Sequence, residues 1–371
     1  MTELTPCDCE FFVKNEDKSQ PWPEHYETCA KRLLERKFNG EFKNDFLKQT
    51  NPYLKNLDQD FLYHLALDTK THNMPAMFGD VKFVCMGGTP NRMEQLIKLA
   101  VEEFGIELPT GCGFVDLTAA SHRYCMYKAG PILAINHGIG VTTLSVVLQE
   151  VIKLLQYAGI KDPIIIRVGT SGGINVEPGT VVVSNKCYDG MLKEAYDLVG
   201  SFFPFFFLHL TLFRRALSIE VASMGEKTDD FKTVNAGTVC ANDFYNGQGR
   251  VDGPFCHYTD GDKMEFLTTL KEMGVKNIEM EATCLAALTY MAGIKCVDVC
   301  VTFLDRLNGD QVLHIIKLII KKIRNILDSV QTWAVRSIDF LTFTNRSQSL
   351  EHRCQVTSNP DIAGSNLGKS K

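Results

Sequence analysis

From about residue 58 onward, the chain alternates between two hydrophobic patterns. Short apolar runs, several of them ending in glycine, predict buried strands. Between most of the strands, apolar residues recur every three or four positions, and this spacing predicts helices. The predicted strands cover residues 82–86, 131–137, 163–168, 180–184, 234–240 and 295–302. The clearest predicted helices cover residues 92–104 and a stretch with Leu144, Val147, Val151 and Leu155 on one face.

This order of strands and helices predicts an α/β fold, namely a single-domain α/β/α sandwich with a central mixed β-sheet. Residues 1–55 are polar and lack a period, so we expect a poorly ordered extension with one helix at 26–36. The domain is expected to span residues 56–330, and a loosely ordered tail to cover 331–371. In such folds, ligands bind beyond the carboxyl ends of the strands.

Composition narrows the class of protein. Hydrophobic residues make up 45% of the 371 residues, and the net charge of -5 provides no overall basic field for nucleic acid. The thirteen cysteines show neither a CxxC pair nor the Cys/His spacing of a zinc site. There is no signal peptide at the start and no apolar run of membrane-spanning length. We therefore expect a cytoplasmic protein with reduced thiols, no metal and no membrane partner.

Two arginines lie beside glycines, one after a predicted strand and one within a predicted strand. Gly87 and Gly88 allow close approach of a ligand to the backbone, and Arg92 begins the next helix, an arrangement suited to phosphate. Taken alone, an ordinary turn with a solvated arginine explains this segment better. Arg167 lies in a very apolar strand that we expect to end in a glycine-rich turn at residues 169–173, and a buried arginine needs an anionic partner. That partner is either a protein carboxylate or a ligand oxyanion.

Two further segments suit a base and a sugar. Phe244 offers a stacking face, Gln248 both donates and accepts hydrogen bonds, and Arg250 donates, so that together they suit the edge of a planar heterocycle. A plain polar loop is the alternative. Glu281 precedes a predicted helix at 282–291, where a buried carboxylate can accept hydrogen bonds from vicinal hydroxyls. The helix dipole also explains a glutamate there, and by itself this explanation is favoured.

Together, these segments resemble the uridine phosphorylase branch of the nucleoside phosphorylase superfamily, most of all its animal members. The resemblance covers residues 58–197 and 231–311. It is carried by HNMPAMFGDVKFVCMGG at 72–88, IIIRVGTSGGINVEPGTVV at 164–182, DFYNGQGRVDG at 243–253 and NIEMEA at 277–282. Four ordered motifs of this length make coincidence a poor explanation.

The resemblance implies reversible phosphorolysis of uridine to uracil and ribose 1-phosphate, with inorganic phosphate as co-substrate and no cofactor. It implies a homodimer in which each subunit completes the other's site. The implied phosphate-binding residues are Gly88, Arg92, Arg123, Arg167 and Thr170. The implied base-binding residues are Phe244, Gln248, Arg250 and Arg306; the implied ribose-binding residues are Met280, Glu281 and, from the partner subunit, His72. The implied catalytic residues are Arg92, Arg167, Glu281 and Arg250.

The choice of base rests on one alignment and one pair of side chains. Purine-cleaving relatives carry an aspartate after a late strand, and Arg306 falls at that position here, as in pyrimidine enzymes. Asp305 is one residue away, so a shifted alignment would weaken the argument. Gln248 and Arg250 favour a pyrimidine independently.

Two stretches depart from the family pattern. Residues 199–213 are unusually rich in phenylalanine, and residues 312–330 have helical spacing with interspersed lysines where the family has a polar loop covering the base. We expect the second stretch to form the closing helix, with a basic membrane-surface helix as the alternative. Because the lid is altered, a catalytically impaired nucleoside-binding homologue stays open beside the enzyme. A purine phosphorylase and a hydrolytic nucleosidase are further alternatives.

Overall fold

The computed structural model describes residues 51–106, 113–199, 206–211, 213, 215–225 and 231–311. The chain divides into two units, one of Met1–Asn44 with Asp197–Leu208 and the other of Asp45–Tyr196 with His209–Lys371. The fold described below is that of the second unit. The predicted helix at 26–36, the closing helix at 312–330 and the tail lie outside the described residues, and the predicted domain limits stay predictions.

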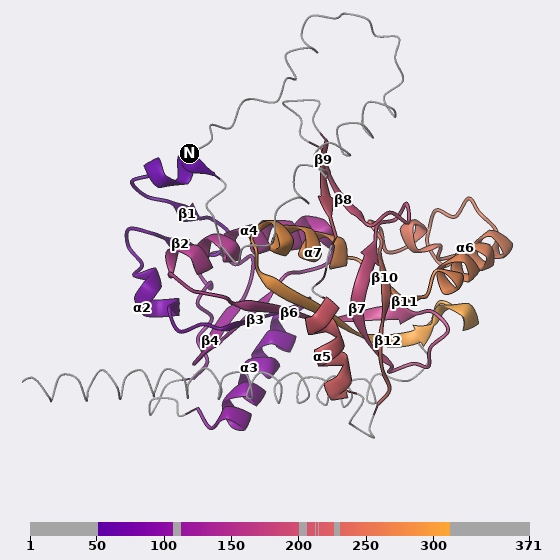
Figure 1. The fold of residues 1–371 in the computed structure, drawn as a ribbon, viewed down its shortest axis with the longest axis horizontal. Helices are drawn as coiled ribbons and strands as arrows, with labels where there is room; N and C mark the ends of the chain where they lie inside the picture. Colours follow the sequence, from indigo (N-terminus) through magenta and orange to yellow (C-terminus); the bar gives the residue numbers. More distant parts are fainter. Residues whose placement is uncertain are drawn as a thin grey trace, which may run out of the picture. The chain divides into compact units, whose positions relative to one another are not determined.

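The centre of the fold is an eight-stranded sheet with the order β11-β10-β7-β12-β6-β3-β5-β4 (Figure 1). Its strands are β3 (Phe83–Gly87), β4 (Met126–Ala129), β5 (Ile132–Asn136), β6 (Ile164–Gly173), β7 (Val181–Tyr188), β10 (Thr233–Cys240), β11 (Val275–Glu279) and β12 (Lys295–Asp305). β3 is parallel to β5 and β6, and β6 is parallel to β12. β4 is antiparallel to β5, and β7 is antiparallel to β12. The sheet is therefore mixed, as predicted.

One end of this sheet closes on itself. β11 pairs in parallel with β10 and in antiparallel fashion with β6. Since β10 pairs with β7, β7 with β12 and β12 with β6, these five strands form a closed ring. We call them the five-stranded barrel. Alternate residues of each barrel strand point inward, so that side chains from distant parts of the sequence meet inside it.

Helices cover both faces of the sheet. α3 (Pro90–Phe104) packs on β3, β4 and β5, and α5 (Arg215–Gly225) packs on β7, β10 and β12. On the opposite face, α7 (Ala282–Met291) packs against α4 (Gly140–Tyr157) (Figure 1). This arrangement confirms the predicted α/β/α sandwich. The remaining elements are η2 (Pro52–Asn56), β1 (Phe61–Leu62), β2 (Leu67–Asp68), α2 (Met74–Phe78), β8 (Ala195–Val199), β9 (Phe206–Leu210), η3 (Asn246–Gln248), α6 (Asp260–Glu272) and η4 (Arg306–Asn308).

Capping residues and apolar faces explain the positions of the two predicted helices, α3 and α4. Thr89 caps α3 by accepting a hydrogen bond from the backbone N–H of Arg92, and Pro90 suits the first turn. α3 ends at Gly105, whose φ of 57° favours glycine. The four apolar residues predicted to share one face of α4 are all buried in the core: Leu144, Val147, Val151 and Leu155.

The prediction of a glycine-rich turn at residues 169–173 was wrong. β6 continues through these glycines, because pairing with β12 and β11 keeps the backbone extended. A Cβ on Gly169 would lie 2.8 Å from Nη2 of Arg167, and a Cβ on Gly172 would lie 3.0 Å from Cγ of Arg306. The glycines therefore leave room for two arginine side chains.

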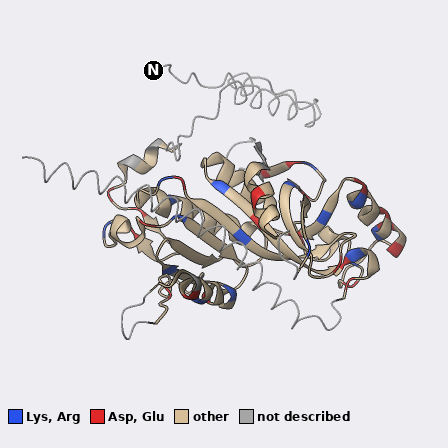
Figure 2. Cartoon of the chain, turned by 60° about the horizontal axis from the view of Figure 1, so that its bottom comes forward, with Lys and Arg blue, Asp and Glu red and all other residues tan. Residues whose placement is uncertain are grey.

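Charged residues of both signs are interspersed over the described elements (Figure 2). For example, α6 carries Asp260, Asp262 and Lys271 near its ends. Within the described ranges, no helix is both long and apolar enough to cross a membrane.

We expect Leu154→Ala to lower the free energy of unfolding by about 2–5 kcal/mol, because it opens a cavity under α4 at a fully buried position. Urea unfolding followed by circular dichroism measures the change. The matched control is Gln149→Ala on the exposed face of the same helix, expected within about 0.5 kcal/mol of the unsubstituted protein. Equal losses in both variants would contradict the assigned core.

Candidate active site

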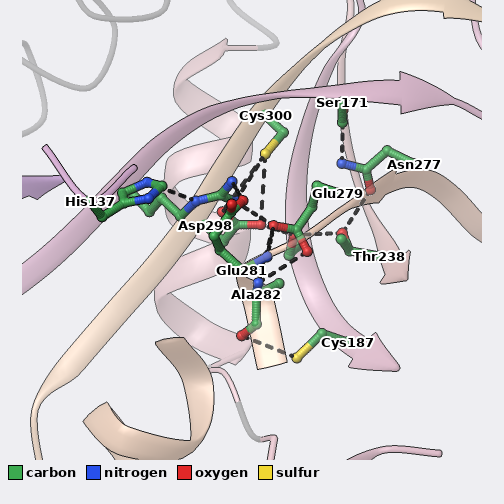
Figure 3. A network of polar contacts seen from close by, with 12 residues as sticks. His137, Ser171, Cys187, Thr238, Asn277, Glu279, Glu281, Ala282, Asp298 and Cys300 are labelled. Carbon is green, nitrogen blue, oxygen red and sulfur yellow. Dashed lines mark hydrogen bonds and ion pairs between the residues drawn. The ribbon is translucent and has the colours of Figure 1, made fainter. Parts of the chain in front are cut away.

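Arg167 lies inside the five-stranded barrel and is only 2% exposed. Its Nη1 is 2.6 Å from Oδ1 of Asp298 and 2.7 Å from Oε2 of Glu279. Its Nη2 forms an ion pair with Glu281, and its Nε donates to Nε2 of His137 at 3.4 Å. Figure 3 shows the three carboxylates gathered on the side away from His137. Protein carboxylates, one of the two alternatives left open by the sequence, are therefore partners of this arginine.

The cluster contains more acidic than basic side chains. With all groups ionised, one guanidinium would face three carboxylates. Burial raises the pKa of Glu279 to about 8; Arg167 opposes this rise, and Asp298 and Glu281 add to it. Burial would lower the pKa of Arg167, but Glu281 and Asp298 raise it well above its ordinary value. The guanidinium is therefore charged, and Glu279 retains a proton more readily than it does in water.

Two neutral groups complete the surroundings of Arg167. Burial lowers the pKa of His137 well below its usual range, and the charges of Arg167 and Arg92 add to this effect. Cys300 lies 3.4 Å from Nη1 of Arg167, and burial raises the pKa of its thiol well above the ordinary value. Neither group therefore compensates for the charge of the carboxylates.

The two glutamates of the cluster have different local roles. Glu279 ends β11, and its carboxylate accepts hydrogen bonds from the backbone N–H groups of Glu281 at 2.8 Å and Ala282 at 3.0 Å. It thereby satisfies donors at the start of α7. Glu281 is 5% exposed and accepts from the backbone N–H of Gly140 as well as from Arg167. Met280 lies beside Gly140, since a Cβ on that glycine would be 3.9 Å from its Cε.

Arg92 lies next to this cluster. Its Nη1 donates to the carbonyl oxygen of Val168 at 3.4 Å, and a Cβ on Gly88 would lie 3.9 Å from the same nitrogen. Burial lowers the pKa of Arg92; the charge of Arg167 adds to this effect, while Glu281 opposes it. Two neighbouring guanidinium groups beside a glycine suit an anionic ligand.

The structure brings together some of the predicted phosphate-site residues but not all. Gly88, Arg92 and Arg167 lie together, and Thr170 is half-buried on β6. Arg123 is exposed, in the turn before β4. Within the described part of the chain, no hydrogen bond or ion pair joins its side chain to the other two arginines. Its phosphate-binding role stays a prediction.

The four predicted base-binding residues form a second cluster. The Arg250 guanidinium lies over the Phe244 ring, 4.6 Å from its centroid, and Phe244 is 45% exposed. Nε and Nη2 of Arg250 donate to Asp252 at 2.8 and 2.6 Å. Gln248 is buried, and its backbone carbonyl oxygen accepts a hydrogen bond from Nη2 of Arg306 at 2.9 Å.

Arg306 is fully buried in this second cluster. Its Nε donates to Oδ1 of Asp310 at 2.8 Å, whereas its Nη1 has no hydrogen-bond partner among the residues that the structure describes. Asp310 also accepts from Lys263 at 3.0 Å. A buried guanidinium nitrogen without a partner is costly, so this donor is available to a ligand. Sequence reasoning missed Asp310 and Lys263, although both lie within residues 231–311, which the resemblance covers.

Comparisons with known proteins decide the family. A family model described as "Phosphorylase superfamily" matches residues 82–332. Human uridine phosphorylase 2 is 45% identical over 72% of this chain and 83% of its own length. The uridine and thymidine phosphorylase of Caenorhabditis elegans is 43% identical over 74% of this chain and 90% of its own length.

The chain belongs to the uridine phosphorylase family.

Solved structures agree with this family assignment. A uridine phosphorylase of the oomycete Phytophthora capsici matches with a TM-score of 0.75 at 35% identity, over 79% of this chain and 98% of its own. Uridine phosphorylase from Schistosoma mansoni in complex with thymidine matches with a TM-score of 0.73 at 33% identity, over 78% of this chain and 98% of its own.

A further relative by sequence, also from Schistosoma mansoni, is named inactive uridine phosphorylase B. It is 34% identical over 71% of this chain and 87% of its own length.

The described contacts of His72 are to its neighbours Asp68 and Thr71. It occupies a surface turn, where its Nδ1 accepts from the backbone N–H of Asp68 at 3.3 Å and contacts Thr71 at 3.0 Å. Its side chain is 32% exposed. The contribution of His72 to a neighbouring subunit's site stays a prediction.

We expect the free energy of unfolding to fall as the pH rises from about 5 to about 8. The pKa of Glu279 is raised from 4.5 to about 8, so the folded protein binds a proton that the unfolded chain releases in this range. The slope is at most about 1.4 kcal/mol per pH unit for one proton. Urea unfolding at a series of pH values measures it.

The matched control for this pH dependence is Asp298→Asn. Because Asp298 adds to the rise in the pKa of Glu279, the variant should show a smaller fall over the same range. Identical slopes in the two proteins would show that the cluster does not take up the proton.

Proposed function

We propose that this protein catalyses the reversible phosphorolysis of uridine to uracil and ribose 1-phosphate. The observation that carries the proposal is the proximity of two guanidinium groups, Arg92 and Arg167, to the buried carboxylate of Glu281. An anion site beside a sugar-binding carboxylate suits attack by phosphate on a nucleoside. Family membership and the named activities of the relatives support the same reaction.

Phosphate would occupy the side of Arg167 that the protein leaves open. Nη1 donates to Asp298 and to the sulfur of Cys300 and forms an ion pair with Glu279, Nε donates to His137, and Nη2 keeps one N–H beyond its pair with Glu281. That donor, the Arg92 guanidinium and the backbone at Gly88 form the anion site, with the hydroxyl of Thr170 beside it on β6. Arg123 supplies the third guanidinium in this proposal.

Glu281 would hold the ribose. A carboxylate has about four acceptor positions, and Gly140 and Arg167 occupy two of them here. The others are available to sugar hydroxyls, with Met280 packed alongside and His72 reaching in from a partner subunit. We accordingly propose a homodimer that acts in the cytoplasm.

Uracil would bind at the second cluster, stacked against Phe244 and held through Gln248 and Arg250. As the bond to the sugar loosens, negative charge develops on the base. Arg250 and the unpartnered Nη1 of Arg306 supply positive charge to stabilise it. Positioning and electrostatics carry this mechanism, so the proposal needs no metal, organic cofactor or covalent nucleophile.

A catalytically impaired nucleoside-binding protein is the second candidate. The specific observation in its favour is the Schistosoma mansoni relative named inactive, to which this chain is 34% identical. The departures at residues 199–213 and 312–330 point the same way. Such a protein would bind uridine or uracil without turnover.

Uracil release from uridine, followed with phosphate present or withheld, tests the proposal. We expect release that depends on phosphate and is accompanied by ribose 1-phosphate, with no cleavage of inosine or adenosine. Release without phosphate would indicate a nucleosidase. Tight binding of uridine without release under either condition would establish the second candidate.

We expect Arg92→Ala to raise the KM for phosphate by about 10- to 100-fold, because a charge-assisted hydrogen bond contributes roughly 1.5–3 kcal/mol. The fold should survive, since this side chain makes its described hydrogen bond to a single backbone carbonyl. Lys98→Ala, on the exposed side of α3 and paired with Glu94, is the matched control and should leave the KM unchanged. An unchanged KM in Arg92→Ala would remove this arginine from the phosphate site.

A further inference from the structure

Each strand of the five-stranded barrel contributes one buried polar side chain to a continuous hydrogen-bonded belt. The belt consists of Asp298 on β12, Ser184 on β7, Thr238 on β10, Asn277 on β11 and Ser171 on β6. The first four are fully buried, and Ser171 is 8% exposed. The order of contacts around the belt is the order of the strands around the barrel.

The contacts along the belt are short. Oδ2 of Asp298 lies 2.8 Å from Oγ of Ser184, which lies 2.6 Å from Oγ1 of Thr238. Oγ1 of Thr238 lies 2.7 Å from Oδ1 of Asn277, and Nδ2 of Asn277 donates to Ser171 at 3.1 Å. Figure 3 shows Ser171, Asn277 and Thr238 in sequence, with Asp298 beside Glu279 and Glu281.

Asp298 joins this belt to Arg167. Its Oδ1 accepts from Nη1 of the arginine at 2.6 Å, while its other oxygen faces Ser184. The position of the guanidinium is therefore tied through one carboxyl group to all five strands of the barrel. Side chains fixed in this way retain their geometry when a ligand arrives.

Counting protons along the belt shows which charge state it requires. Three oxygen–oxygen contacts connect Asp298, Ser184, Thr238 and Oδ1 of Asn277, and each needs one proton. The two hydroxyl groups supply only two. A protonated Asp298 supplies the third, so that Asp298 donates to Ser184, Ser184 to Thr238 and Thr238 to Asn277.

The belt has one other consistent arrangement, with the Asn277 amide turned over and Asp298 ionised. Ser171 would then donate to Asn277, and the proton chain would run towards Asp298. The proton taken up by the cluster would then lie on Glu279, whose described contacts are all to hydrogen-bond donors. These contacts therefore favour the arrangement with a protonated Asp298.

The three carboxyl groups also differ in what surrounds them. The described contacts of Glu279 and Glu281 are to backbone N–H groups and to Arg167, all of which are donors. Asp298 alone among the three faces a group that can accept a proton, the hydroxyl of Ser184. The raised pKa of Glu279 indicates that the cluster takes up a proton, and the contacts of the three groups favour Asp298 as its holder.

We propose that Asp298 is a positioning residue for Arg167, which it holds as a neutral carboxylic acid anchored in the hydrogen-bonded belt. A neutral acid orients the guanidinium without cancelling its charge, so that the charge stays available to phosphate. The positioning part rests on the proposed function of Arg167. The protonation state of Asp298 does not.

Two substitutions separate the positioning role of Asp298 from its neutral charge. Calorimetric titration with inorganic phosphate measures the Kd of each variant and does not require turnover. Asp298→Asn keeps an acceptor for Arg167 and a donor for Ser184, so we expect a Kd for phosphate within about threefold of the unsubstituted protein. Asp298→Ala removes both contacts and should raise the Kd by about tenfold or more. Thr289→Val, which removes a buried hydroxyl from α7 outside the belt, is the matched control and should leave the Kd unchanged.

Specific results would overturn the proposal. An unchanged Kd in Asp298→Ala would show that the residue does not position Arg167. A loss in Asp298→Asn as large as in Asp298→Ala would show that a neutral group cannot replace it. If Asp298→Ala fails to fold, as judged by circular dichroism, the Asp298→Asn titration decides alone.

Infrared spectroscopy tests the proton directly. At pH 7 we expect the carbonyl band of a neutral carboxylic acid that shifts when aspartate carries a ¹³C carboxyl and that is absent from Asp298→Asn. No such band, or a band that shifts only with labelled glutamate, would overturn the neutral acid. If the unsubstituted protein binds no phosphate, the proposed function and the positioning role fail together, and the infrared result still decides the charge of Asp298.

Discussion

Burial of the Arg167 guanidinium is the constraint on which the site depends. A charge inside a barrel must be paired, since an uncompensated buried charge destabilises a fold by several kcal/mol. Glu279 at the end of β11 and Glu281 at the start of α7 form ion pairs with the guanidinium, and Asp298 on β12 accepts a hydrogen bond from its Nη1. This leaves the arginine with a fixed orientation and with one N–H of Nη2 for a ligand.

The topology explains why these groups meet. β11 pairs with both β10 and β6, and this closure brings Glu279 and Glu281 against the strand that carries Arg167. β12 runs beside β6 and contributes Asp298 near its middle and Arg306 just after its end. The glycines of β6 leave space for both arginine side chains. One strand thus supports the proposed phosphate site and borders the proposed base site.

Local sequence patterns predicted the elements better than the contacts between them. The apolar run at 282–291 predicted α7, and the helical spacing of apolar residues at 92–104 predicted α3. β11 was missed because Lys276 and Asn277 interrupt its apolar run. The run at 169–173 was mistaken for a turn, because the pattern of glycines does not show that a side chain from elsewhere fills the space above them.

The partners of Arg167 could not be deduced from spacing, since Glu281 and Asp298 lie 114 and 131 residues further along the chain. The resemblance supplied roles for Glu281 and Arg306 but no geometry. It gave no signal for Asp298 or Ser184, and the hydrogen-bonded belt forms only because the barrel closes. Polar residues in apolar strands were the available signal, and Asp298 within residues 295–302 is such a residue.

A crystal structure with inorganic phosphate and uridine tests the central claim most directly. The account predicts phosphate within hydrogen-bonding distance of Arg92 and of Nη2 of Arg167, a ribose hydroxyl on Glu281 and the uracil ring against Phe244. Phosphate bound away from both arginines, with Arg167 enclosed by its carboxylates and remote from the ligand, would contradict it.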